Sequence, residues 1–222
     1  MLYEADLIAD ASALIVTASH HLLDQDGIPL SRDRSDAEGL AITADGRLFI
    51  SFERQHRIDE FQRHQTIQTS SMPSTITLPP NGGFEALAAD ATGTLWTLPE
   101  TPLKGAFPLL QLSEGQWKER GSLPQSGRFL PVGADFDARG SLYILERSNQ
   151  LWRFRSRIRR INNPTEASKD IEILWENAYG NYDNLEGILV LDSATDEIRL
   201  LLVSDDNQMP FQTTQVLMVQ LE

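Results

Sequence analysis

Acidic residues stand at the ends of paired, strand-like segments of this sequence, and side chains of that type could hold a hard cation. Three glutamates begin such segments, and an Asp-Asp-Asn run ends another. Carboxylate and amide oxygens are the ligands that calcium takes, in a flexible geometry. The sequence therefore predicts calcium as a cofactor, and the candidate metal ligands are Glu38, Glu85, Glu186, Asp205, Asp206 and Asn207.

Two Glu-Arg pairs, Glu53–Arg54 and Glu146–Arg147, follow further strand-like segments, and Glu100 ends another. Arginine grips a phosphate or a carboxylate through parallel hydrogen bonds. We therefore predict substrate-binding roles for Arg54, Arg147 and Glu100, and catalytic roles for Glu53 and Glu146. The predicted reaction is calcium-assisted hydrolysis of a phosphoester or ester, in which metal and arginines polarise the bond and a carboxylate directs water.

A structural role competes with the chemical one. A glutamate that opens each inner strand could accept hydrogen bonds from backbone amides of the neighbouring repeat and so latch the repeats together. This interpretation is favoured for Glu38, Glu85 and Glu186, whereas the run from Asp205 to Asn207 departs from the repeat pattern and favours function. The Glu-Arg pairs could likewise be rim ion pairs, which contribute little stability.

The elements that must position these residues repeat along the chain. Three copies share one pattern: AEGLAITADGRLFISFER from Ala37, FEALAADATGTLWTLPE from Phe84 and PVGADFDARGSLYILER from Pro131. Their turn glycines, Gly46, Gly93 and Gly140, follow one another at steps of 47 residues. A fourth copy, from Asn184, carries the longer turn DSATDE. Each copy, an apolar strand, a tight turn and an alternating strand, predicts a β-hairpin.

A hairpin plus outer strands, repeated at nearly 50 residues, is typical of a β-propeller blade, and we favour that all-β fold over a β-sandwich. The two outer ends of a hairpin lie together, so the acidic residues should gather at one mouth of the central channel. Two departures stand out. Val132 aligns with the glutamates that open the other copies, and Glu146 lies six rather than seven residues after its turn glycine, a shift that turns a side chain to the opposite face unless a bulge absorbs it.

Residues 1–222 are predicted to form a single propeller domain. Residues 36–222 supply four repeated blades, whereas residues 1–35 contain two outer strands, YEADLIAD and ALIVTASHHLL, of an incomplete first blade. Incomplete closure would expose a sheet edge. The segment LWRFRSRIRRI from Leu151 is predicted to be an outer strand whose arginines form a solvated face, with balance against acidic neighbours as an additional role.

Composition excludes several function classes. The formal net charge of −13 disfavours nucleic acid and anionic membranes as partners, and the absence of cysteine excludes disulfides and thiolate sites. The first ten residues do not have the pattern of a signal peptide, and the longest mostly apolar run is too short to cross a bilayer. The four histidines show no metal-ligand spacing and argue against zinc. No G-x-S-x-G elbow, RHG motif or phosphate-binding glycine loop occurs.

A set of short motifs carries a family resemblance: DAEGLA from Asp36, SFERQHRI from Ser51, FEALAA from Phe84, ILERS from Ile144, DNLEGI from Asp183 and SDDNQ from Ser204. In this order they resemble the phytase-like family, also called "esterase-like activity of phytase". The resemblance implies a bacterial propeller of five to six blades, ester hydrolysis, and a periplasmic or extracellular location. The chain as written, without a signal segment, points instead to the cytoplasm.

Two functions remain open at this point. The first is a hydrolase acting on a small anionic or ester substrate at the acidic mouth. The second is a propeller that binds a ligand or a protein without chemistry and has at most a structural metal. The sequence specifies neither the substrate nor the oligomeric state, because propeller specificity lies in loop shapes.

Overall fold

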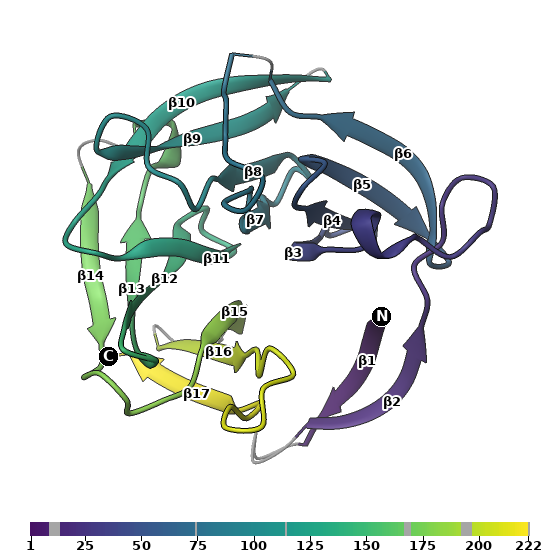
Figure 1. Cartoon of the computed structure of the whole chain (residues 1–222). Coiled ribbons are helices and arrows are strands. Elements are labelled where there is room, and N and C mark those ends of the chain that lie inside the picture. The colour runs from purple at the N-terminus through teal and green to yellow at the C-terminus, as the bar shows by residue number, and fades with distance from the viewer. Residues whose placement is uncertain (9–13, 74, 114, 167–169, 192–196, 222) are drawn as a thin grey trace.

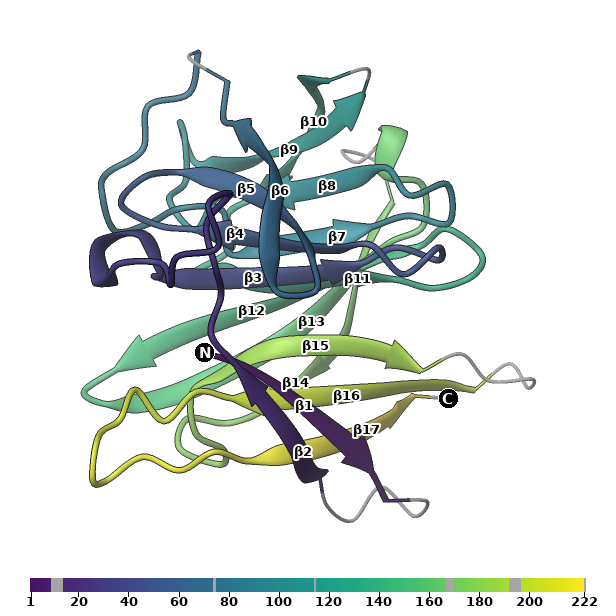
Figure 2. The same ribbon diagram turned by 90° about the vertical axis from the view of Figure 1, so that its right-hand side faces the viewer.

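The computed structural model describes residues 1–8, 14–73, 75–113, 115–166, 170–191 and 197–221. In this part of the chain, five antiparallel sheets surround a central channel, which confirms the predicted all-β propeller (Figure 1). Figure 2, turned by 90°, shows the inner strands running along the channel. No helix among the described residues is long and apolar enough to cross a membrane.

Three sheets have four strands each, in the order of the chain from the channel outwards. The first of these contains β3 (Ala37–Ile42), β4 (Leu48–Phe52), β5 (Arg57–Gln62) and β6 (Gln65–Ser71). The next contains β7 (Ala86–Ala89), β8 (Leu95–Leu98), β9 (Ala106–Ser113) and β10 (Gln116–Pro124). The third contains β11 (Leu130–Phe136), β12 (Leu142–Gln150), β13 (Arg153–Ile161) and β14 (Ile171–Glu176).

The remaining two sheets are smaller. β15 (Leu185–Leu191), β16 (Ile198–Ser204) and β17 (Val216–Leu221) form a three-stranded sheet. β1 (Leu2–Leu7) and β2 (Leu14–His20) pair only with each other among the described residues. Short 3-10 helices occupy Arg32–Arg34 and Pro164–Glu166.

The predicted hairpins are β3–β4, β7–β8, β11–β12 and β15–β16. Their shared turn glycines adopt left-handed backbone conformations, with φ of 83° at Gly46 and 87° at Gly140. An aspartate holds two of these turns: the Asp90 carboxylate accepts the backbone amides of Thr92 and Thr94, and the Asp137 carboxylate accepts those of Arg139 and Ser141. Glycine and aspartate thus fix the register that brings the hairpin ends to the mouth.

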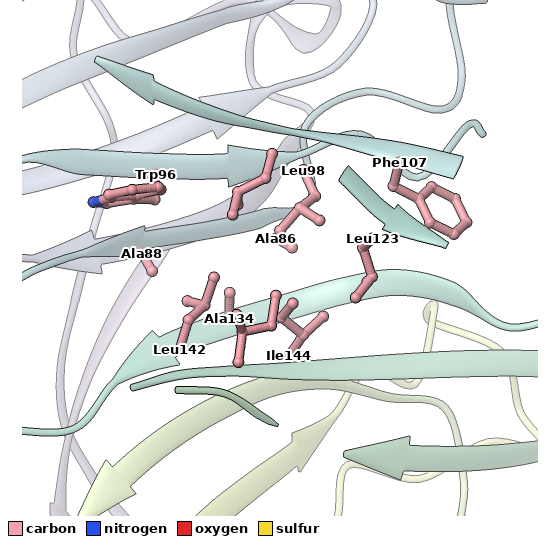
Figure 3. Close-up of a cluster of buried hydrophobic side chains, with 11 residues drawn as sticks. Ala86, Ala88, Trp96, Leu98, Phe107, Leu123, Ala134, Leu142 and Ile144 are labelled. Atoms are coloured by element: carbon pink, nitrogen blue, oxygen red, sulfur yellow. The ribbon is translucent and has the colours of Figure 1, made fainter. Parts of the chain in front are cut away.

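The core lies between neighbouring sheets rather than in the channel. Figure 3 shows Leu98, Phe107 and Leu123 of one four-stranded sheet facing Leu142 and Ile144 of the next, all fully buried. Towards the channel the side chains become small. A Cβ atom at Gly39 would clash with the backbone oxygen of Glu85 and with the hydroxyl of Ser51, so glycine permits the inner strands to converge there.

Candidate functional site at the channel mouth

Register shifts in the inner strands place the acidic side chains in the channel. The β15–β16 register shifts between Leu185 and Gly187, at Glu186, and the β3–β4 register shifts between Ala37 and Leu40, at Glu38. A bulge leaves one residue out of the ladder and re-aims its side chain, and bulges are common beside active sites. Together with Glu85, which directly precedes β7, these glutamates line a cavity of about 470 Å³.

The guanidinium of Arg147 lies among these carboxylates. Its Nη2 donates to Oε1 of Glu100 at 3.1 Å, and its Nη1 donates to Oδ1 of Asn184 at 2.6 Å and also to Oε1 of Glu186. Arg147 lies on β12 opposite Leu130, at the end of the β11–β12 ladder. In this blade the register shift that holds a glutamate in the β3–β4 and β15–β16 hairpins falls at Val132 instead. Arginine therefore enters the ring from the blade that contributes no glutamate to it.

Burial and mutual repulsion raise the pKa values of the ring carboxyls. Desolvation, followed by repulsion from Glu100, raises the pKa of Glu85 to about 10, although attraction to Arg147 opposes the rise. Desolvation and the carboxylates of Glu53 and Asp36 raise the pKa of Glu38 to about 8. The pKa of Glu186 is raised by desolvation as well. The pKa of Arg147 is also raised, because attraction to Glu186 and its neighbours outweighs desolvation. The ring therefore has more carboxyl groups than its single arginine could balance if all of them were ionised.

Glu53 combines a structural role with a place at the mouth. Its Oε1 accepts the backbone amides of Gly82 at 2.5 Å and Gly83 at 2.9 Å, so it latches its blade to the loop that leads into the next one. Carboxylate oxygens of Asp36, Glu38 and Glu53 nevertheless lie within 4.8 Å of one another, close enough to share a cation. The latch expected of the strand-opening glutamates is thus made by a strand-ending one.

The structure does not place Glu146 at the mouth. Its carboxylate is fully buried inside the blade and is bound by Arg157 and Arg159 of β13. The one-residue shift relative to the other copies has this consequence: Glu146 points into the blade, and the next residue, Arg147, points to the channel. The solvated face expected for the arginines of LWRFRSRIRRI is therefore wrong for Arg157 and Arg159, which are 2% and 5% exposed and balance Glu146.

Arg54 lies at the rim rather than in the ring. Its Nε donates to Oδ2 of Asp36 at 2.8 Å, and its Nη1 lies 3.5 Å from Oδ1 of Asp33. The side chain is 46% exposed and has a left-handed backbone, with φ of 58°. Arg54 and Arg147 therefore occupy different parts of the mouth.

The residues Asp205, Asp206 and Asn207, which follow β16, also lie in different parts of the mouth. Asp205 lies next to the ring, since its amide donates to the backbone oxygen of Asn184 and its charge contributes to the raised pKa of Glu186. Asp206 instead shapes the loop, where its carboxylate accepts the amide of Gln208 and the hydroxyl of Thr214. Asn207 is exposed, with φ of 48°, and its backbone amide donates to the carboxylate of Asp205.

Two residues of the mouth were not among the predicted site residues. Asn184 bridges Arg147 and Glu186, and Asp36 pairs with Arg54 beside Glu38. Both stand two residues before a channel glutamate, in the loop that leads into its strand, where the strand pattern of the sequence does not reach.

The fold and this mouth define a β-propeller with an acidic, arginine-bearing channel end. The chain belongs to the phytase-like family, described as "esterase-like activity of phytase", whose family model matches residues 1–208. A comparison with curated proteins finds no match.

Two solved structures show the same propeller fold at low sequence identity. The Hadza microbial sialidase Hz136 is 12% identical with a TM-score of 0.53, and the match covers 94% of this chain and 50% of that one. The hydrazine synthase of Kuenenia stuttgartiensis is 13% identical with a TM-score of 0.50, and the match covers 93% and 54%. The chain thus spans about half the length of these solved structures.

Proposed function

We propose that this protein is a calcium-assisted hydrolase that acts on a small anionic ester at the channel mouth. The observation that carries the proposal is the convergence of Glu38, Glu85 and Glu186 on one cavity, with Arg147 in contact with Glu186 and with the neighbouring Glu100. Membership of a family named for esterase-like activity supports the reaction class.

The residues present fit calcium. The ring offers carboxylate oxygens from several blades and the amide oxygen of Asn184, which are hard donors suited to a large divalent cation. Protons on buried ring carboxyls such as Glu85, whose pKa is raised to about 10, now occupy positions that a cation would take. Binding would release these protons, as is general for metal sites with protonated ligands.

The chain's own residues supply the rest of the proposed chemistry. Bound calcium would polarise the ester and lower the pKa of a water. Arg147, held by Glu100 and Glu186, would orient the anionic group of the substrate. Glu53 and Glu146 are engaged by amides and arginines, so we assign the water-directing role to Glu38, which lines the cavity and whose pKa of about 8 suits a general base near neutral pH.

Thermal melting in EGTA and in excess calcium, followed by phosphomonoester and carboxylester assays on the same samples, tests this proposal. A calcium-dependent rise in Tm together with calcium-dependent turnover is expected, and Glu38→Gln should lower turnover more than it lowers the Tm rise. Turnover that is unchanged in EGTA would contradict the role of calcium.

A binding propeller without chemistry is the second candidate, and a specific observation favours it. Both carboxylates predicted to be catalytic make structural bonds: Glu53 holds two backbone amides and Glu146 holds two arginines. A calcium-dependent Tm rise without turnover on a broad ester panel would select this candidate.

A further inference from the structure

Three residues that are distant in the sequence meet beside the two-stranded sheet. Glu4 lies on β1, His20 ends β2, and His64 lies in the turn between β5 and β6. Their potential ligand atoms all lie within 4.8 Å of one another. The spacing of the histidines along the chain predicted no metal site, because only the folded chain brings them together.

The distances agree with one shared metal. Nε2 of His20 lies 3.3 Å from Oε1 of Glu4, and Nε2 of His64 lies 3.4 Å from the same oxygen. Zinc binds histidine nitrogen and carboxylate oxygen at about 2.0–2.2 Å in tetrahedral sites, which separates neighbouring ligand atoms by about 3.4 Å. The same nitrogen of each ring thus already stands at a ligand's distance from the carboxylate.

The local backbone holds His64 in this position. Arg63 and His64 form a two-residue turn in which both residues are left-handed, with φ of 49° and 67°, a turn that normally favours Asn-Gly. The His64 carbonyl accepts the amide of Leu23 at 2.8 Å, so the segment after β2 is bonded to this turn (Figure 1). A histidine thus occupies a strained position at the junction of two sheets, as residues at functional sites often do.

We propose that Glu4, His20 and His64 form a zinc site that fastens the β1–β2 sheet to the β3–β6 sheet. Two imidazoles and a carboxylate are a ligand set suited to zinc, whereas calcium takes oxygen ligands. Glu4 and His64 also line a cavity of about 730 Å³, so water or a ligand can take the fourth position.

Zinc binding would rearrange the rings. The imidazoles of His20 and His64 are now stacked, with centroids 3.7 Å apart and planes inclined by 9°. Lone pairs that lie in parallel planes do not converge on one point, so the two rings must turn apart about their side-chain bonds. Both side chains are partly exposed, 32% and 27%, which leaves room for the rotation.

Such a site has a structural consequence. An isolated pair of strands is at best marginally stable in water, and within the described residues β1 and β2 have no further strand in their sheet. A metal held by both sheets would stabilise their junction because it binds the folded chain only.

The proposal is tested by titrating the whole chain with zinc, with calorimetry to measure binding and thermal melting to measure stability. One zinc per chain and a higher Tm are expected. His20→Gln, His64→Gln and Glu4→Gln should each weaken binding at least about tenfold, since loss of an outer-shell partner alone costs about 10–100-fold. His21→Gln is the matched control, because His21 is the exposed neighbour of His20 outside the cluster, and it should bind zinc as the wild type does. Equal binding in all four variants, or no binding by the wild type, would overturn the proposal.

A measurement on the unaltered chain guards against variants that fold poorly. In a nitrogen-15 spectrum of the four histidines, zinc should shift Nε2 of two imidazoles and leave the other two in place. Shifts spread over all four rings would overturn the site. The calcium-dependent Tm rise should persist in the His64→Gln variant, so failure at this site is distinguishable from failure of the channel proposal.

Discussion

Two charged networks are built from glutamate and arginine side chains. One lies inside the third four-stranded sheet and the other lies beside it at the channel mouth, and they differ in whether the arginines balance the carboxyl groups. Inside the sheet, Glu146 is fully buried and each of its oxygens accepts an arginine, from Arg157 or Arg159. At the mouth, Arg147 contacts Glu100 and Glu186, and Glu186 shares an open cavity with Glu38 and Glu85. Both oxygens of the single carboxylate are bound by arginine in the first network, whereas the second contains more carboxyl groups than its arginine contacts. Adjacent residues, Glu146 and Arg147, thus serve structure and a candidate site respectively.

Removing the centre of the closed network should have the largest effect. Glu146→Ala leaves two buried guanidinium groups without a counter-charge, and breaking a buried pair in this way costs about 3–5 kcal/mol. Urea denaturation should show a loss of that size. Glu172→Ala is the control, because Glu172 makes an exposed pair with Arg160, and it should cost no more than about 1 kcal/mol. Similar losses in both variants would contradict the contrast drawn between buried and exposed pairs.

Removing the arginine of the open network should have a smaller effect that calcium reverses in part. Arg147→Ala leaves Glu100 and Glu186 without their partner, at a cost of about 1–3 kcal/mol, and excess calcium should recover some of it. Arg54→Ala, at the exposed rim, should cost less than about 1 kcal/mol. Denaturation midpoints with and without calcium measure both effects. A loss at Arg147 that calcium leaves unchanged would mean that no cation replaces its charge.

The difference between the two networks also marks what the sequence could predict. Hairpin copies at a fixed step predicted the propeller, and their geometry predicted that Glu38, Glu85 and Glu186 share a mouth. The repeat pattern predicts these features because each hairpin is formed by residues that are close together in the sequence. The partners of Glu146 depend on which face a strand presents after a one-residue shift, and the meeting of Glu4, His20 and His64 depends on how two sheets pack. Neither the partners of Glu146 nor this cluster can be predicted from a local sequence pattern.

The carboxyl groups of the channel mouth should make the stability of the chain depend on pH. The ordinary pKa of a glutamate here is 4.5, and the folded values for Glu38 and Glu85 are about 8 and about 10. The folded chain therefore keeps protons that the unfolded chain releases, so the free energy of unfolding should fall as pH rises from about 5 through 8 towards 10. Urea midpoints across this range measure the fall, and saturating calcium should reduce it.

Replacing the buried carboxyl should flatten that profile. Glu85→Gln keeps the shape of the protonated acid without its ionisation, so it should stabilise the chain by about 1 kcal/mol or more near pH 9 in EGTA, since one pKa unit corresponds to about 1.4 kcal/mol. The same variant should show a weaker response to calcium. A variant profile as steep as that of the wild type would place the titrating groups outside the channel.

The smallest predicted effect separates the two aspartates after β16. Asp205 adds its charge to the ring beside Glu186, whereas Asp206 is occupied by Gln208 and Thr214 within the loop. Asp205→Asn should therefore weaken the calcium-dependent Tm rise, and Asp206→Asn should leave it nearly unchanged, each at a stability cost within about 1 kcal/mol in EGTA. Calcium titrations followed by melting distinguish the two variants. Equal weakening would bring Asp206 into the site and would extend the open network into the loop.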